Sequence, residues 1–165
     1  MGTSPTLRDV ADTAHWVALY RAIESERSDA HFHDPYARRL AGPRGEQIVA
    51  TLPRSMQNAA WSVVARTVVM DRMIQAEISA GVTLVVNLAA GLDTRPYRLS
   101  LPAHLTWVEV DQAELLAEKA ALLESATPSC ALERIPLDLS QEAPTRLLLQ
   151  QLGQRAAKVL VVTEG

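Results

Sequence analysis

The feature that most constrains the fold is an apolar run that ends in a turn of small residues. Residues 85–88 read Val-Val-Asn-Leu and residues 89–95 continue Ala-Ala-Gly-Leu-Asp-Thr-Arg, while a second apolar run ends at Asp111. In an open α/β sheet the turn after the first strand brings its backbone close to a ligand, so small residues belong there. An acid at the tip of the next strand, about 20 residues further on, is placed to bind a ribose diol. The two features together predict a nucleotide-cofactor site.

A change of period at Gly81 divides the chain into two predicted domains. Before it, helical spacing predicts a helix over 7–28, a short helix that starts at Pro35 and ends at Gly42-Pro43, and a long helix over 58–80 capped by Gly81. After it, alternating strands and helices predict a parallel sheet. Strands are expected near residues 83–88, 106–110, 132–136 and 158–163, and helices near 112–124 and 143–153. Residues 1–80 are therefore predicted to form a helical cap, and residues 81–165 a sheet domain.

Composition excludes several classes of function. The chain has 165 residues, 48% of them hydrophobic and 21% charged, which is typical of a globular protein of single-domain length. A formal net charge of −3 without a long basic run argues against nucleic acid as a partner. No apolar stretch has the length of a membrane span. Cys130 is the single cysteine, so an internal disulfide is excluded, and a lone cysteine of this kind is typically a small core residue. We therefore expect a cytoplasmic protein. His31, His33 and Asp34 alternate in a loop bounded by proline, which is more typical of a polar surface than of a metal site.

Several short motifs together resemble one protein family. Residues 87–95 closely resemble the N-L-G-A-G-L-D-T-R signature of the leucine carboxyl methyltransferase family, O-methyltransferases that depend on S-adenosylmethionine. The other similar segments are residues 13–14, 21–27, 33–37, 65–67, 108–111, 137–139 and 162–165. Ala89 replaces the first glycine of the family's G-x-G turn. Family members are usually longer, so the resemblance covers their N-terminal part.

The resemblance implies the fold, the cofactor and the class of substrate. The expected fold is α/β, a Rossmann-like class I methyltransferase sheet with its first four parallel strands in the order 3-2-1-4, and with the N-terminal helices as a cap over the cofactor. Residues 81–165 would be the N-terminal half of that cofactor-binding domain. The implied cofactor is S-adenosyl-L-methionine, and the implied substrate is a small molecule of the secondary-metabolite type, methylated on a carboxylate or a hydroxyl. A hydroxyl acceptor would need a general base, and the sequence nominates none.

Two candidate residues follow from the turn itself. Gly91 has no Cβ, so the chain can pass flush against the methionine part of the cofactor there. Asp111 can accept both ribose hydroxyl protons. The structural alternatives are a tight turn without a ligand and a cap for a helix that starts at Gln112. Asp93 and Arg95 complete the signature, where a turn-stabilising pair explains them equally well.

Four further residues are assigned by the resemblance. Asp138 matches an acid that meets the adenine amino group, with Leu139 beside the ring, and the alternative is a helix cap or an Asx turn. Arg66 matches an arginine that holds the cofactor's carboxylate by two parallel hydrogen bonds, although an arginine on a helix is ordinarily a solvated charge. Glu164 matches a glutamate near the cofactor's amino group and the methyl-transfer region.

Two other functions stay open at this point. Residues 158–163 would form an apolar edge strand, which favours self-association. The second interpretation is therefore a catalytically incompetent cofactor-binding fragment, or a chain that forms a homo-oligomer through this edge. An NAD-dependent oxidoreductase is the third, because both cofactor classes share the turn and the acid after the second strand. The absence of a complete G-x-G-x-x-G counts against the dinucleotide.

Overall fold

The computed structural model describes residues 10–52 and 60–164, and these residues fall into two compact units. The first unit comprises the described residues up to Asp71 together with Leu92–Thr94. The second comprises Arg72–Gly91 and the described residues from Arg95 onward. The division into a cap of residues 1–80 and a sheet domain of residues 81–165 stays a prediction.

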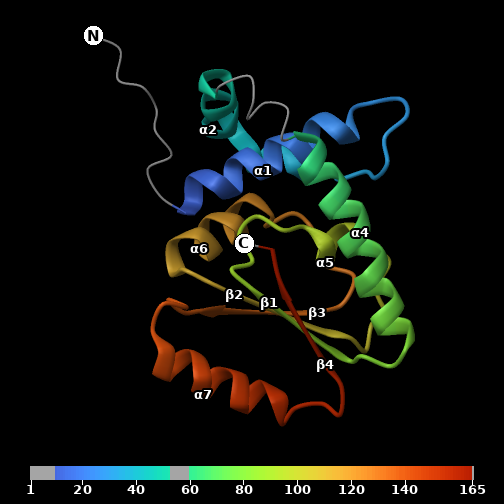
Figure 1. Ribbon diagram of the computed structural model, residues 1–165, viewed down its shortest axis with the longest axis vertical. Helices are drawn as coiled ribbons and strands as arrows, with labels where there is room; N and C mark the ends of the chain where they lie inside the picture. Colours follow the sequence, from blue (N-terminus) through green and yellow to red (C-terminus); the bar gives the residue numbers. More distant parts are fainter. Residues whose placement is uncertain (1–9, 53–59, 165) are drawn as a thin grey trace. The chain divides into compact units, whose positions relative to one another are not determined.

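Two packed helices, α1 (Val10–Ser25) and α2 (Ala37–Thr51), form much of the first unit (Figure 1). They meet closely at Gly45, where an added Cβ would lie 2.7 Å from the carbonyl oxygen of His15. The His15 ring in turn contacts the carbonyl oxygen of Leu40 through Nδ1 at 3.1 Å. The helix predicted over residues 7–28 is confirmed from Val10 to Ser25, its end lies three residues earlier than expected, and its predicted first turn lies outside the described residues.

The short helix predicted to end at Gly42-Pro43 is followed directly by a second helical segment within α2. Gly42 has the left-handed φ of 54° and breaks the helix there, as the sequence indicates. Helical backbone resumes at Pro43 and continues to Thr51, so the short helix ends where predicted, and the second helical segment after the kink was not predicted. This segment can begin at Pro43 because proline fits the first turn of a helix, where its missing N–H has no partner to lose.

Gly81 ends the long helix α4 (Ala60–Ser79) as predicted. Its φ of 96° is left-handed, its N–H donates to Ile78 O at 3.0 Å, and the N–H of Val82 donates to Glu77 O at 3.1 Å. This pair of hydrogen bonds is the Schellman motif, which satisfies carbonyl groups at a helix end. The predicted start at Asn58 lies outside the described residues. No helix among residues 10–52 and 60–164 is long and apolar enough to cross a membrane.

The second unit is built on a four-stranded parallel sheet. Its strands are β1 (Leu84–Leu88), β2 (Thr106–Asp111), β3 (Ala131–Pro136) and β4 (Val159–Thr163), in the order β3-β2-β1-β4. The predicted α/β class, strand order and parallel pairing are therefore confirmed. β1 is central and almost completely buried, which explains its nearly continuous apolar sequence.

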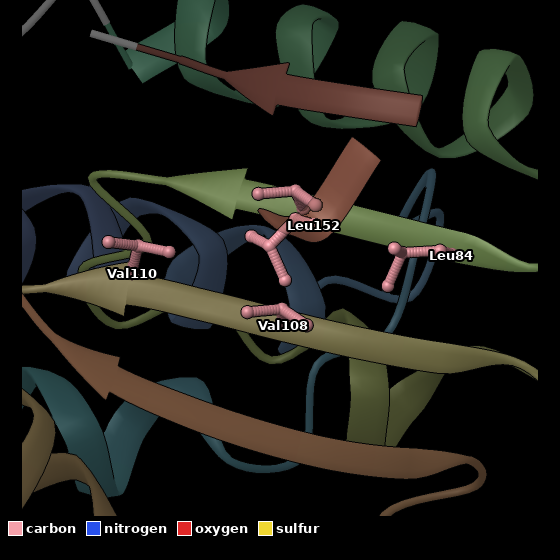
Figure 2. Packing of buried hydrophobic residues seen from close by; sticks show 5 residues of the cluster. Leu84, Val108, Val110 and Leu152 are labelled. Carbon is pink, nitrogen blue, oxygen red and sulfur yellow. The ribbon is translucent and has the colours of Figure 1, made fainter. Parts of the chain in front are cut away.

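Helices cover both faces of this sheet, with α6 (Ala113–Leu122) on one side and α7 (Glu142–Gly153) on the other (Figure 1). Figure 2 shows the core on the α7 side, gathered over β1 and β2. This core consists of Leu84, Val86, Val108, Val110 and Leu152. Alternate residues of the same strands face α6, because side chains of a strand alternate between the two faces. A short helix, α5 (Arg95–Arg98), follows the signature turn and was not predicted.

β4 lies at an edge of the sheet. Among the strands that the structure describes, it pairs only with β1. Its sequence Val-Leu-Val-Val-Thr carries no charge, and Val161 is 50% exposed. An uncharged edge strand presents unpaired backbone groups to another chain, so the predicted edge is present in the structure.

Candidate functional site

The signature turn after β1 has a left-handed backbone at two positions. Ala89 has a φ of 52° and Gly91 a φ of 48°. Between them, the N–H of Ala90 donates to the carbonyl oxygen of Val110 in β2 at 3.2 Å. The turn is thereby attached to the end of the neighbouring strand, at the edge of the sheet where parallel α/β proteins bind ligands.

Asp111 joins this turn to the start of α6. Its Oδ2 accepts a hydrogen bond from the Gly91 N–H at 2.6 Å, and its Oδ1 accepts one from the Gln112 N–H at 2.7 Å. The structure thus brings together the two residues that the sequence predicted to share a site. The structural alternative, a cap on a helix that starts at Gln112, has a different geometry in the structure, because α6 begins at Ala113 and Oδ1 binds the N–H of the preceding Gln112. A carboxylate has about four lone-pair positions, so both oxygens keep acceptor capacity for hydroxyl groups.

A hollow of about 330 Å³ opens beside these residues, where β2 and β3 end. Its lining consists of Gln112, Ala113, Glu114, Pro136, Leu137 and Asp138. Small-molecule sites commonly have volumes of about 300–1,000 Å³. The hollow is therefore large enough for part of a nucleoside, and it adjoins Asp111 through Gln112.

Asp138 forms a turn at the rim of this hollow. Its Oδ1 accepts hydrogen bonds from the Ser140 hydroxyl at 2.7 Å and from the Ser140 N–H at 3.0 Å. These bonds, the hydroxyl's first, lower the pKa of Asp138 below its usual value. The Asx turn that was the structural alternative is present, and contact with an adenine amino group stays a prediction. Leu139 is partly buried and packs against the core on the α7 side, so its place beside an adenine ring also stays a prediction.

Glu164, just beyond β4, forms an ion pair with Arg95 of the signature. The guanidinium side chain of Arg95 is only 4% exposed, and the Glu164 side chain is 22% exposed. The pair connects α5 to the end of β4. The sequence singled out both residues but did not predict that they are partners, and the proposed role of Glu164 toward an amino group is untested.

Comparison with known proteins identifies the family. The sequence profile of leucine carboxyl methyltransferases matches residues 14–165. The chain belongs to this family.

Three relatives provisionally named S-adenosyl-L-methionine-dependent methyltransferases are about a third identical to this chain over the aligned residues. A Frankia alni protein is 36% identical over 146 residues, covering 82% of this chain and 51% of the relative. A Mycolicibacterium gilvum protein is 34% identical over 157 residues, covering 84% of this chain and 51% of the relative. A Streptomyces coelicolor protein is 36% identical over 144 residues, covering 82% of this chain and 51% of the relative. The chain thus spans about half the length of these family relatives.

Arg66, the residue predicted to hold a cofactor carboxylate, is partly buried on α4 in the first unit. Its neighbour Thr67 is buried and donates to the carbonyl oxygen of Val63 at 2.8 Å. Arg66 therefore lies next to the buried face of the helix. Its family role toward the cofactor remains a prediction.

The histidines near residue 31 contact other groups of the first unit. His31 Nδ1 lies 2.9 Å from Glu24 Oε1, and its ring meets Trp61 edge to face. His33 Nδ1 lies 3.2 Å from the carbonyl oxygen of Ser25. Among the residues that the structure describes, no three His, Cys, Asp or Glu side chains are grouped as metal ligands.

A buried charge network in the second unit was missed by sequence reasoning. Lys119 of α6 donates to Glu109 Oε1 at 2.6 Å, and both side chains are fully buried. Arg134 Nε donates to the other oxygen of Glu109 at 3.0 Å and reaches the Tyr97 hydroxyl through Nη2. Burial, and then the nearby Glu109 charge, raise the pKa of the Cys130 thiol to about 11. Cys130 is therefore a protonated core thiol, as the sequence predicted.

Ala89 stands where the family's G-x-G turn has its first glycine. Its φ of 52° lies in the left-handed region, so we expect the backbone to be strained there. An L-residue in the left-handed region costs about 1–2 kcal/mol, which glycine avoids. Glycine also loses more conformational freedom on folding, so we expect Ala89→Gly to raise the free energy of unfolding by about 0.5–1 kcal/mol. Urea denaturation measures this difference.

Ala90→Gly is the matched control, because Ala90 is buried and does not have a positive φ. This substitution is expected to lower the free energy of unfolding by about 0.5–1 kcal/mol. A loss of stability in both variants would contradict the assigned strain at Ala89.

Proposed function

We propose that this chain binds S-adenosyl-L-methionine and contributes to transfer of its methyl group to an oxygen of a small molecule. The observation that carries the proposal is the Asp111 carboxylate bonded to Gly91 at 2.6 Å beside a hollow at the strand ends. Membership of the leucine carboxyl methyltransferase family supports the same cofactor, as do the names of the relatives.

The residues of the chain fit the chemical groups of this cofactor. Asp111 would accept hydrogen bonds from the ribose hydroxyls, and Asp138 one from the adenine amino group, because carboxylates are acceptors for such donors. Arg66 would bind the amino-acid carboxylate through two parallel hydrogen bonds. Glu164 would attract the cofactor's ammonium group while it remains paired with Arg95, since one carboxylate can accept several hydrogen bonds.

The cofactor supplies an activated methyl group on a positively charged sulfur. The protein's contribution is to hold the acceptor oxygen in line with the breaking bond and to exclude water. No covalent intermediate on the protein is needed. A carboxylate acceptor is already deprotonated at neutral pH, whereas a hydroxyl acceptor would need a base from elsewhere in the active protein.

We propose a small-molecule acceptor and a cytoplasmic location, the latter because the single thiol suits a reducing compartment.

Isothermal titration of the 165-residue chain with S-adenosylhomocysteine, and separately with NAD, tests the proposal. Saturable binding of S-adenosylhomocysteine without binding of NAD is the expected result. Binding of NAD alone would instead support an oxidoreductase. If neither ligand binds, this chain does not form the proposed site.

A second proposal concerns self-association through β4. Its support is the uncharged edge strand with Val161 half exposed, which can pair with the same strand of another copy. We expect sedimentation velocity to show a dimer that increases with protein concentration. Val161→Lys is expected to shift the population to monomer, because charge on an edge strand opposes pairing.

Leu147→Lys provides the control for the β4 edge. Leu147 lies on α7 and is 55% exposed, close to the exposure of Val161 but away from the edge. A wild-type chain that stays monomeric at every concentration would exclude this proposal. Equal behaviour of the two lysine variants would exclude β4 as the interface.

A further inference from the structure

The segment before the sheet contains buried charges that the proposed function does not explain. Arg21 and Glu24 of α1 are each 5% exposed, and Asp34 in the following loop is 3% exposed. Burying charged groups costs free energy unless they are paired and hydrogen-bonded. Their hydrogen-bond partners therefore indicate what these residues stabilise.

Arg21 binds the backbone of the signature turn. Its Nη2 donates to the carbonyl oxygen of Leu92 at 2.6 Å, although the two residues are 71 positions apart. Its Nε lies 3.6 Å from Asp34 Oδ2. A charged donor strengthens a buried hydrogen bond, so this contact fixes the position of the Leu92 peptide group.

Asp34 binds a side chain of the same turn. Its Oδ2 accepts a hydrogen bond from the Thr94 hydroxyl at 2.6 Å, and its Oδ1 accepts one from the Tyr36 N–H at 3.1 Å. Thr94 is fully buried. Arg21 and Asp34 therefore hold two of the three residues in Leu92–Thr94.

The loop that carries Asp34 is itself attached to α1. The Ser25 hydroxyl accepts from the Asp34 N–H at 2.9 Å and donates to the carbonyl oxygen of Arg21 at 2.7 Å. Glu24 Oε1 accepts from the His31 N–H at 2.8 Å. Burial raises the pKa of Glu24, but the bonds from His31 and the charge of Arg27 outweigh it and lower that pKa overall. These contacts fix the position of the loop residue Asp34, which accepts the hydrogen bond from Thr94.

We propose that Arg21 and Asp34 are positioning residues that fix Leu92–Thr94 and thereby set the affinity for the cofactor. This inference rests on the proposed function, because Leu92 directly follows Gly91, whose N–H binds Asp111. A turn that is already ordered does not have to be ordered by the ligand, so binding is tighter. The residues act on the turn and need not touch the cofactor.

The test uses the 165-residue chain with Asp34→Asn, Thr94→Val and the double variant. We expect each single substitution to weaken binding of S-adenosylhomocysteine by about 10-fold in isothermal titration, which corresponds to about 1.4 kcal/mol. The double variant is expected to bind about as weakly as either single variant, because both remove the same contact. Additive losses would show that Asp34 and Thr94 act separately and would overturn the proposal.

Asp12→Asn is the matched control. Arg44 binds Asp12 through Nε at 2.7 Å and through Nη2 at 2.5 Å, so this partly buried pair joins α1 to α2 in the same unit. The substitution is expected to lower the midpoint of thermal unfolding about as much as Asp34→Asn. It should leave the affinity for S-adenosylhomocysteine within about 2-fold of the wild type. If Asp12→Asn weakens binding equally, a general loss of structure explains the effect and the proposal fails.

Hydrogen exchange of the ligand-free chain tests whether Asp34 orders Leu92–Thr94 independently of whether the chain binds the cofactor. Amide hydrogens of Leu92–Thr94 are expected to exchange faster in Asp34→Asn than in wild type, and at an unchanged rate in Asp12→Asn. A wild-type chain that does not bind S-adenosylhomocysteine would refute the proposed function, while the exchange rates would still decide whether Asp34 orders the turn. Unchanged exchange in Asp34→Asn would overturn the positioning role.

Discussion

Replacing Glu109 with leucine is expected to lower the free energy of unfolding by about 3–5 kcal/mol, the typical cost of breaking a buried ion pair. Glu109 and Lys119 are both fully buried, with Nζ 2.6 Å from Oε1. Removal of the carboxylate leaves the ammonium of Lys119 inside the protein without its negative partner. Arg134 also loses the oxygen that its Nε contacts at 3.0 Å. Urea denaturation of the variant, followed by circular dichroism, measures the loss.

Glu133→Leu is the control for Glu109→Leu, because Glu133 lies on the adjacent strand β3 and pairs with Arg155 at the surface. The two side chains are 42% and 39% exposed, so breaking this pair is expected to cost at most about 1 kcal/mol. The double variant Glu109→Leu with Lys119→Met should recover much of the lost stability, since replacing a whole buried pair by apolar groups is often neutral. Equal losses for Glu109→Leu and Glu133→Leu would show that the buried network is not stabilising.

Replacing Asp111 with alanine is expected to weaken binding of S-adenosylhomocysteine by about 100-fold or more. Two hydrogen bonds from ribose hydroxyls to a charged carboxylate contribute about 1.5 kcal/mol each, or about 3 kcal/mol together. The substitution also removes the bond at 2.6 Å that attaches the Gly91 N–H, so the turn loses a support. Isothermal titration of the wild-type and variant chains measures the ratio of dissociation constants.

Glu114→Ala provides the matched charge control for Asp111→Ala. Glu114 lines the same hollow but is exposed on α6, so the variant loses one negative charge near the site without affecting the turn. Its affinity for S-adenosylhomocysteine is expected to stay within about 2-fold of the wild type, because exposed charges are well screened. An Asp111→Ala chain that binds as tightly as Glu114→Ala would exclude Asp111 from ribose binding.

The sheet could be predicted from the sequence because its signals are local. The apolar runs mark the four strands, and Gly81 marks the helix end because only a residue without Cβ readily adopts its φ of 96°. Gly91 and Asp111 were predicted to share a site because parallel strands end at the same edge of a sheet, and their hydrogen bond confirms the proximity. Helix α2 was predicted only up to Gly42, since a Gly-Pro pair indicates a stop and does not show that a new helix begins.

The partners of the buried charges could not be predicted, because each pair joins distant positions. Arg95 meets Glu164 only once β4 lies beside β1, and Lys119 meets Glu109 only once α6 covers the sheet. From the sequence alone, these residues cannot be distinguished from ordinary charged residues on the exposed surface of a helix or strand. Their burial follows from tertiary packing, which local periodicity does not encode.

The raised pKa of Cys130 has a practical consequence for spectroscopy of this protein. Cys130 is the only cysteine in the sequence, it is buried, and its pKa is about 11. Because the thiolate is the reactive form, only about one molecule in 10,000 carries it at pH 7. A cysteine introduced on an exposed helix would therefore react with a maleimide dye far faster than the native thiol. The wild-type chain thus provides an almost unreactive background for attaching a fluorescent probe at a chosen position.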